Sequence, residues 1–221
     1  MPGRDADNER IVVLTITARF PSLVQTWLIN QLIEIQRNGG ENRILARTAD
    51  RDVIPENVRK FGLDQNCVYV PFGRKALFRD LIASCFRFSG LRAVVRGLLR
   101  LPRVMRSSEL SLREKLNALL LLKHMGMRGI SVIHSHREMA RSYLLPDVIA
   151  LNVPLVVTFH GLPPVGVEPI SERKRKAYTS VASAILLNTE FAKAQYVSLG
   201  DPEYNIRVLP HVLRLSDFPF R

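Results

Sequence analysis

The feature that most constrains the fold of this chain is a regular alternation of short apolar runs with segments of helical spacing. The first run, Ile11–Ile16, is apolar or β-branched throughout, as expected for a strand buried on both faces of a parallel sheet. Further strands are predicted at 44–46, 68–70, 130–133, 155–159, 184–187 and 206–209. Such a strand–helix series requires right-handed crossovers and a parallel sheet. We therefore expect an α/β, three-layer domain with a mostly parallel sheet.

Local signals place helices between these strands. Two pairs have the spacing of a capping box, Ser22 with Gln25 and Ser111 with Glu114, and each pair can satisfy free N–H groups of a first helical turn. Further helices are predicted at about 138–151, 171–181 and 189–199. Residues 210–221 contain two prolines and no helical or strand period, so we expect them to leave the sheet as an extended segment.

Length and composition fit one globular domain. The chain has 221 residues, of which 47% are hydrophobic and 24% charged, so it can bury a core and lacks the composition of a disordered protein. It contains no apolar run of 18 residues, and its first ten residues are polar and mixed in charge. We therefore expect neither a signal peptide nor a spanning helix, and a cytoplasmic location.

The positive charge of the chain is concentrated in one segment. The net charge is +12, and residues 73–106 hold nine basic residues against one acid. Apolar residues recur there at near-helical spacing, and another face carries an arginine stripe made of Arg92, Arg96, Arg100 and Arg103. This pattern predicts a basic amphipathic helical insertion on an anionic membrane surface. The alternative is a helix pair packed on the core with a solvated basic face.

Several function classes lose support because their motifs are missing. The sequence has no Walker phosphate loop, no G-x-G-x-x-G, no G-x-S-x-G and no Cys/His zinc spacing, which argues against nucleotidases, NAD enzymes and serine hydrolases. We expect no cofactor and no metal. Nucleic-acid binding is also disfavoured, because the aromatic residues of the basic segment stand among aliphatic residues rather than between cations.

Ligands of open parallel sheets bind outside the carboxyl ends of the strands, so the loops that follow the strands hold the candidate site residues. After the first strand, Arg19 and the amides that open the helix at Ser22 can hold a phosphate. Gln25 and Thr26 belong to the same loop. The alternative is a capped helix beside a surface arginine, and spacing alone favours that alternative.

The second candidate loop follows the strand at 130–133 and contains His134, His136, Arg137 and Glu138. Two histidines at i and i+2 point to the same side of an extended chain, but no third metal ligand follows at useful spacing. We interpret His134 as a hydrogen-bonded core residue. We expect His136 to lie past the strand end, where its ring can meet a substrate.

The third candidate loop brings His160 and Gly161 to the end of the strand at 155–159. The glycine allows a ligand to approach the backbone closely. Two histidine-bearing loops at one edge of a sheet suit proton transfer or the binding of oxygen groups. A purely structural role for these residues is equally compatible with the spacing.

Several short motifs, taken in order, resemble a known family. They are Phe20-Pro21, Gln25-Thr26, Asn30-Gln31, Ile133–His136, Val156–Gly161 and the segment from 187 to 218. Their order resembles the N-terminal domain of the family-four retaining glycosyltransferases, and within it most closely the colanic-acid and amylovoran-type polysaccharide transferases.

The resemblance implies a GT-B architecture, in which two Rossmann-like domains face a cleft. Residues 1–209 would be the acceptor-side domain, with 73–106 as an insertion, and 210–221 would begin an interdomain linker. The second domain, which holds the nucleotide sugar and an E-x7-E motif, is not present in this sequence. The resemblance therefore implies half of an active site and a chain that is inactive alone.

The resemblance also implies roles for the candidate residues. His136 and His160 would be catalytic. The acceptor and its phosphate would be bound by Arg19, Ser22, Gln25, Thr26, Arg137, Glu138 and Gly161.

The implied reaction is transfer of a sugar from a nucleotide sugar to a lipid-linked or polysaccharide acceptor, at the inner face of the membrane. The alternative function is a non-catalytic module that binds an anionic membrane or a glycan.

Overall fold

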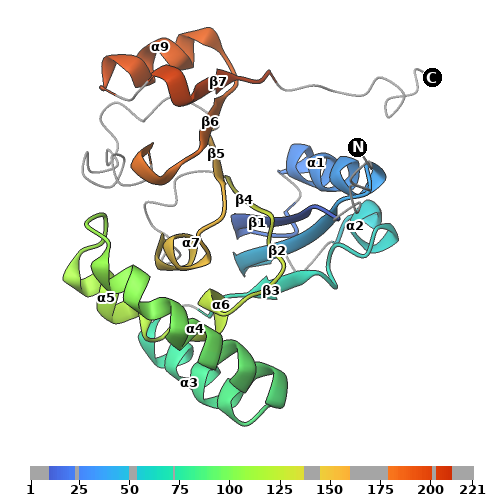
Figure 1. The fold of residues 1–221 in the computed structure, drawn as a ribbon. Helices are drawn as coiled ribbons and strands as arrows, with labels where there is room; N and C mark the ends of the chain where they lie inside the picture. Colours follow the sequence, from blue (N-terminus) through green and yellow to red (C-terminus); the bar gives the residue numbers. More distant parts are fainter. Residues whose placement is uncertain are drawn as a thin grey trace, which may run out of the picture.

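The structure is a computed structural model, described here for residues 10–22, 25–49, 54–71, 73–136, 145–159, 179–200 and 203–210. Its strands are β1 (Val12–Arg19), β2 (Glu41–Thr48), β3 (Cys67–Tyr69), β4 (Val132–His136), β5 (Leu155–Phe159), β6 (Ala184–Leu187) and β7 (Ile206–Val208). They form one sheet in the order β3-β2-β1-β4-β5-β6-β7, and every neighbouring pair is parallel (Figure 1). This confirms the predicted Rossmann-like α/β fold.

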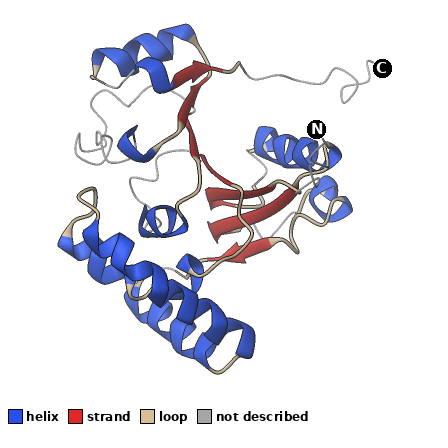
Figure 2. Cartoon of the chain, in the orientation of Figure 1, coloured by secondary structure: helices blue, strands red, loops and turns tan. Residues whose placement is uncertain are grey.

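Helices flank the sheet on both faces (Figure 2). They are α1 (Thr26–Arg37), α2 (Glu56–Lys60), α3 (Arg74–Cys85), α4 (Phe88–Arg106), α5 (Leu112–Ala118), α6 (Leu122–Met125), α7 (Leu145–Leu151) and α9 (Glu190–Ser198), with a short 3-10 turn η2 (Glu203–Asn205) before β7. Within the described ranges, no helix combines the length and apolar character needed to cross a membrane.

Two clusters of buried apolar side chains hold the helices to the sheet. The larger cluster joins Leu14, Ile133 and Val157 of the sheet to α4, α6 and α7. The smaller one packs Leu28 and Leu32 of α1 on β2 and α2. Both faces of β1 are covered, and six of its residues in a row are buried. This confirms the prediction that the first strand is buried on both faces of a parallel sheet.

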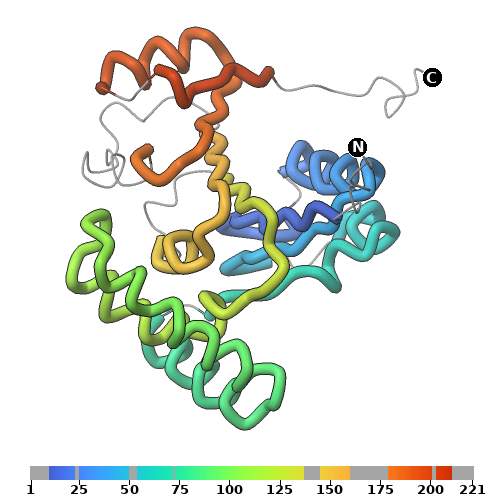
Figure 3. Tube along the Cα trace, in the orientation of Figure 1, coloured from blue at the N-terminus to red at the C-terminus, as the bar shows by residue number. Residues whose placement is uncertain are grey.

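The long crossover from β3 to β4 contains α3, α4, α5 and α6. Helices α3 and α4 lie side by side as a hairpin, here called the α3–α4 hairpin (residues 74–106), at one end of the molecule (Figure 3). Helix α4 contacts α6 through backbone, because a Cβ added at Gly97 would overlap the carbonyl of Leu122 and one added at Gly126 would overlap that of Ala93. Glycine at both positions therefore permits the close approach of the two helices.

The two predicted capping boxes have different outcomes. At α5 the Ser111 hydroxyl accepts a hydrogen bond from the Glu114 backbone N–H at 3.3 Å, and the Glu114 carboxylate accepts one from the Ser111 N–H at 2.8 Å, which confirms that box. The box at α1 was wrong. The N-cap of α1 is Gln25, which makes no side-chain cap, and the Gln25 N–H binds the carbonyl of Ser22 in a preceding turn.

The predicted strands at 155–159 and 184–187 are confirmed residue for residue. The strand predicted at 130–133 is shifted, since β4 covers 132–136. Of the helix predicted at 138–151, the described part is α7, and most of the helix predicted at 171–181 lies outside the described residues.

Candidate functional site

Polar side chains converge on the α1 side of the three central strands. Register partners in parallel strands share a face, and alternate residues face opposite sides. Thr15 of β1 pairs with His134 of β4, and His136 pairs with Thr158 of β5, so these four side chains lie on the same face. Each is no more than 7% exposed. The central strands thus carry a buried polar layer toward their carboxyl ends.

His134 is held by hydrogen bonds on both ring nitrogens. The amide nitrogen of Gln31 on α1 lies 2.9 Å from Nδ1, and the Thr158 hydroxyl lies 2.7 Å from Nε2. Because the amide nitrogen only donates, Nδ1 accepts and the ring proton is on Nε2, which donates to Thr158. This confirms the interpretation of His134 as a hydrogen-bonded core residue.

His136 lies between two rings at the carboxyl edge of the sheet. Its ring centroid is 4.0 Å from that of His134 and 4.9 Å from that of Trp27. The prediction that it lies past the strand was wrong in one respect, because His136 is the last residue of β4 and is 5% exposed. The strand extends further than its apolar run because ladder hydrogen bonds do not depend on the polarity of the side chains.

The loop after β1 separates into an exposed and a buried part. Arg19 and Thr26 are exposed, whereas Ser22 is 1% and Gln25 is 9% exposed. Within the described part of the chain, neither the Ser22 hydroxyl nor the Gln25 side-chain oxygen has a hydrogen-bond partner. Buried polar atoms of this kind are usually satisfied, so the start of α1 carries two buried oxygens with unused hydrogen-bonding capacity. The structure therefore brings Ser22 and Gln25 to the start of α1, beside Trp27.

Four predicted site residues lie outside the described residues: Arg137, Glu138, His160 and Gly161. Their roles stay predictions.

Sequence reasoning did not assign a site role to Trp27, Gln31 or Thr158. A usable signal was the i, i+4 spacing of Trp27 and Gln31, which places both on one face of α1.

The arginine stripe of α4 makes contacts that spacing did not indicate. Arg96 donates to the carbonyl of Gly126 at 2.8 Å, Arg100 to that of Met127 at 2.8 Å, and Arg103 to that of Ala150 at 3.2 Å. Arg92 instead lies over the Phe88 ring, 4.0 Å from its centroid. Three of the four predicted membrane-surface arginines therefore bind backbone carbonyls of α6, α7 and the turn after α6.

No group of three or more His, Cys, Asp or Glu side chains suited to a metal ion occurs in the described ranges. The polar layer instead offers imidazole, amide and hydroxyl groups beside an indole. Such groups suit the binding of a hydroxyl-rich ligand at a strand edge.

Most of the chain also matches a known family. A family model described as Glycosyltransferase Family 4 covers residues 24–216. The chain belongs to this family. That confirms the resemblance at the level of the family. The matched residues include α1, β4 and β5, while β1 precedes them.

Solved structures with a similar fold share few identical residues with this family 4 chain. A UDP-N-acetylglucosamine 2-epimerase aligns with a TM-score of 0.50 and 12% identity over 90% of this chain and 48% of its own. HepE of Anabaena with UDP and glucose aligns with a TM-score of 0.48 and 12% identity over 94% of this chain and 46% of its own. A glycosyltransferase from Rickettsia africae aligns with a TM-score of 0.46 and 13% identity over 91% of this chain and 43% of its own. The chain thus spans about half the length of these structures. Comparison with curated proteins gives no match.

A buried carboxyl lies on the face of the sheet opposite α1, in the first turn of α7. Asp147 is fully buried, and neither of its side-chain oxygens has a hydrogen-bond partner among the described residues. Burial raises the pKa of this carboxyl well above its ordinary value. The neutral acid is therefore favoured at a pH where an exposed aspartate is ionised.

We predict that Asp147→Asn increases the free energy of unfolding at neutral pH. The unfolded chain loses the Asp147 proton near the ordinary pKa while the folded chain retains it, so folding of the native chain becomes less favourable as pH rises through that interval. The amide removes this titration, and its advantage should grow as the pH rises above about 4, the ordinary pKa of an aspartate. Urea unfolding from acidic to neutral pH measures the difference.

Asp80→Asn is the matched control, because Asp80 is bound by Lys123 at 2.9 Å and its replacement should lower stability at neutral pH. If Asp147→Asn lowers stability at neutral pH as much as Asp80→Asn does, the conclusion that the buried Asp147 is a neutral acid is wrong.

Proposed function

We propose that this chain is the acceptor-side domain of a retaining, hexosyl-type glycosyltransferase. It would bind a lipid-linked or polysaccharide acceptor while a nucleotide sugar supplies the transferred group. Membership of Glycosyltransferase Family 4 supports the reaction class. The short motifs from Phe20-Pro21 onward favour an enzyme of the colanic-acid and amylovoran type that acts in polysaccharide biosynthesis.

The observation that carries the proposal is the placement of His136 between Trp27 and His134 at the carboxyl edge of the sheet. Ligands of parallel sheets bind at this edge. In our proposal, His136 binds the reacting hydroxyl of the acceptor, and the hydrogen-bonded His134 fixes the position of its ring. The indole of Trp27 offers a flat apolar surface to a sugar ring.

The other residues of the edge would bind the rest of the acceptor. Arg19 is exposed and suits a phosphate, because a guanidinium can donate two parallel hydrogen bonds to it. Ser22 and Gln25 offer oxygens without partners in the described chain. In our proposal, Thr26, Arg137, Glu138, His160 and Gly161 complete this surface.

We further propose that the site is complete only with a second domain that holds the donor. Residues 1–209 would then form the acceptor domain, and 210–221 would begin the linker. The alternative, a non-catalytic module that binds a membrane or glycan, predicts no transfer in any context.

The chain of residues 1–221 alone should release no nucleotide from nucleotide sugars, since half of the site would be missing. The same chain joined to a family 4 donor domain should transfer sugar to a lipid-linked acceptor. Release of nucleotide and formation of the product are measured together. Transfer by the isolated chain would contradict the two-domain proposal, and no transfer by the joined protein would favour the non-catalytic alternative.

In the joined protein, we predict that His136→Gln lowers kcat by about 10²- to 10⁴-fold, the range for loss of a positioned acid or base. Its unfolding midpoint should change little, because glutamine retains much of the buried volume. His124→Gln is the control, since it removes a buried imidazole from α6, on the opposite face of the sheet. An equal loss of kcat in both variants would remove His136 from the site.

We also propose that the protein is cytoplasmic and attaches peripherally to an anionic membrane through the outer face of the α3–α4 hairpin. Phe86 is 86% and Phe88 is 71% exposed at the turn between the helices. Exposed apolar residues continue along both helices: Phe78, Ile82, Leu91, Val95, Leu98 and Leu99. Arg87 and Arg92 are exposed beside them. An apolar face with adjacent cations is typical of interfacial helices.

The double variant Arg87→Gln, Arg92→Gln should weaken binding to vesicles with anionic lipid by about 30-fold at low salt, because each cation near such a surface contributes on the order of 1 kcal/mol. Phe86→Ser, made in the native chain, should also weaken binding to these vesicles. The control, Arg59→Gln with Lys60→Gln, removes the same charge from α2. Vesicle sedimentation measures all three, and equal binding by the two double variants would refute the hairpin's role.

A further inference from the structure

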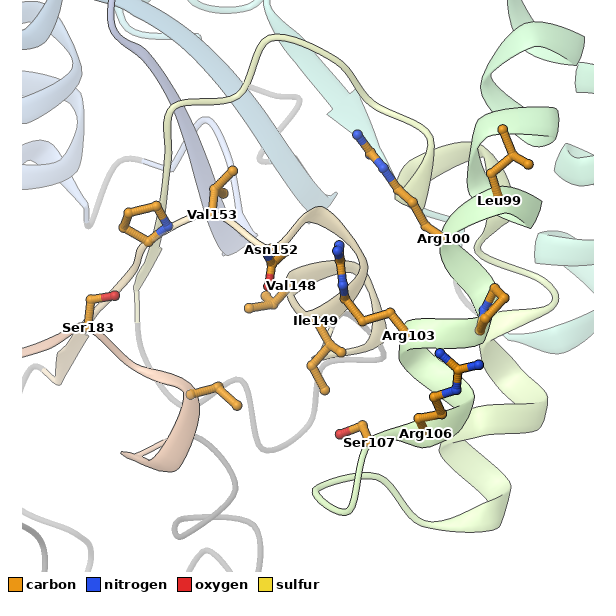
Figure 4. A pocket seen from close by; sticks show the side chains of 13 residues that line it. Leu99, Arg100, Arg103, Arg106, Ser107, Val148, Ile149, Asn152, Val153 and Ser183 are labelled. Atoms are coloured by element: carbon orange, nitrogen blue, oxygen red, sulfur yellow. The ribbon is translucent and has the colours of Figure 1, made fainter.

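A groove lies at the opposite edge of the sheet from the polar layer. It has a volume of about 830 Å³ and runs between α4, α7 and the residues that precede β5 and β6 (Figure 4). Pro154 and Ser183, which directly precede these two strands, form one end of its lining. Amino ends of parallel strands face away from their carboxyl ends, so this groove is separate from the proposed transfer site.

One wall of the groove is cationic. Arg100, Arg103 and Arg106 line it from successive turns of α4, as Figure 4 shows. No Asp or Glu is among the described residues that line it. Burial lowers the pKa of Arg100, and the neighbouring charges of Arg96 and Arg103 lower it further. The groove therefore holds crowded positive charge that no lining carboxylate offsets.

Two of the three guanidinium groups are fixed in place. Arg100 is bound to the carbonyls of Met125 and Met127, and Arg103 to that of Ala150. Each guanidinium has five N–H donors, so donors remain for a ligand. Arg106 makes no hydrogen bond or ion pair with any described residue. A role limited to binding helix-end carbonyls explains Arg100 and Arg103 but does not explain Arg106.

The opposite wall of the groove is mainly apolar, although Asn152 and Ser183 also line it. Ile149 of α7 and Val153 of the turn after α7 line this wall, whereas Leu99 lines the groove from α4, the helix that carries the arginines (Figure 4). Leu99 is 76% exposed, next to Leu98 and one turn beyond Val95 on the outer apolar face of α4. The groove is thus continuous with exposed apolar surface.

We propose that this groove binds one anionic phospholipid, with the phosphate at Arg103 and Arg106 and an acyl chain on Leu99, Ile149 and Val153. Arginine binds phosphate through charge-assisted hydrogen bonds, which suits the cationic wall. The apolar wall has no function for a small inorganic anion, but it matches a hydrocarbon chain. The proposal does not depend on glycosyl transfer, and its test uses neither donor nor acceptor.

The probe is dihexanoyl phosphatidic acid, kept below its micelle concentration so that no membrane surface forms. Calorimetric titration of the chain should show saturable binding. Arg106→Gln should weaken this binding by about tenfold, as expected for loss of a charge-assisted hydrogen bond. Ile149→Ser should also weaken it. Arg113→Gln, which removes an exposed cation from α5, is the matched control and should leave the binding unchanged.

The thermal midpoint of Arg106→Gln should equal that of the native chain, because Arg106 has no partner among the described residues, so weaker binding cannot come from unfolding. Absence of saturable binding, or equal binding by Arg106→Gln and Arg113→Gln, would overturn the proposal. Full displacement of the lipid by an equal concentration of inorganic phosphate would show a simple anion site and would also overturn it. Equal affinity of the groove for dihexanoyl phosphatidylcholine would show that binding does not require an anionic lipid, and would overturn the proposal as well.

Discussion

The shared face of register partners in β1, β4 and β5 is the constraint on which the candidate site depends. It forces Thr15, His134, His136 and Thr158 to lie together under α1. Buried polar groups are costly unless they are hydrogen-bonded, so α1 must present a polar group to His134. Gln31 does this, and one helical turn earlier the same face of α1 carries Trp27, next to His136. A single hydrogen bond between helix and sheet therefore fixes both neighbours of His136.

The fold could be predicted from the sequence because its signals are local and repeated. Strands β5 and β6 follow from unbroken apolar runs, and their order along the chain requires a parallel sheet. The ends of elements were less predictable. At α5 the capping spacing and the helix start coincide, whereas at Ser22 the same spacing forms a turn before the helix. Spacing alone does not distinguish these two cases, because in both the backbone N–H three positions after the serine is bound, by the serine hydroxyl at α5 and by the serine carbonyl before α1.

The candidate site was only partly predictable because its geometry is tertiary. His136 was found from its place near a strand end. Gln31 and Thr158 take part only through their hydrogen bonds to His134, which lies 103 positions from Gln31 and 24 positions from Thr158 in the sequence. The arginine stripe shows the same limit. Helical spacing identifies which arginines share a face of α4, but the direction of that face depends on the contact of α4 with α6 at Gly97 and Gly126. No pattern within one helix contains that information.

Helix α4 connects the outer surface of the domain to the strands that carry the site. Its inner arginines bind the carbonyls at the end of α6, which leads into β4, and that of Ala150 in α7, which leads into β5. Its outer side carries the exposed apolar residues of the hairpin. Because guanidinium–carbonyl bonds and glycine-mediated backbone contact are both short and directional, the helix is held rigidly against these elements. A ligand that binds α4 would therefore contact a helix that is held firmly against the elements leading into β4 and β5.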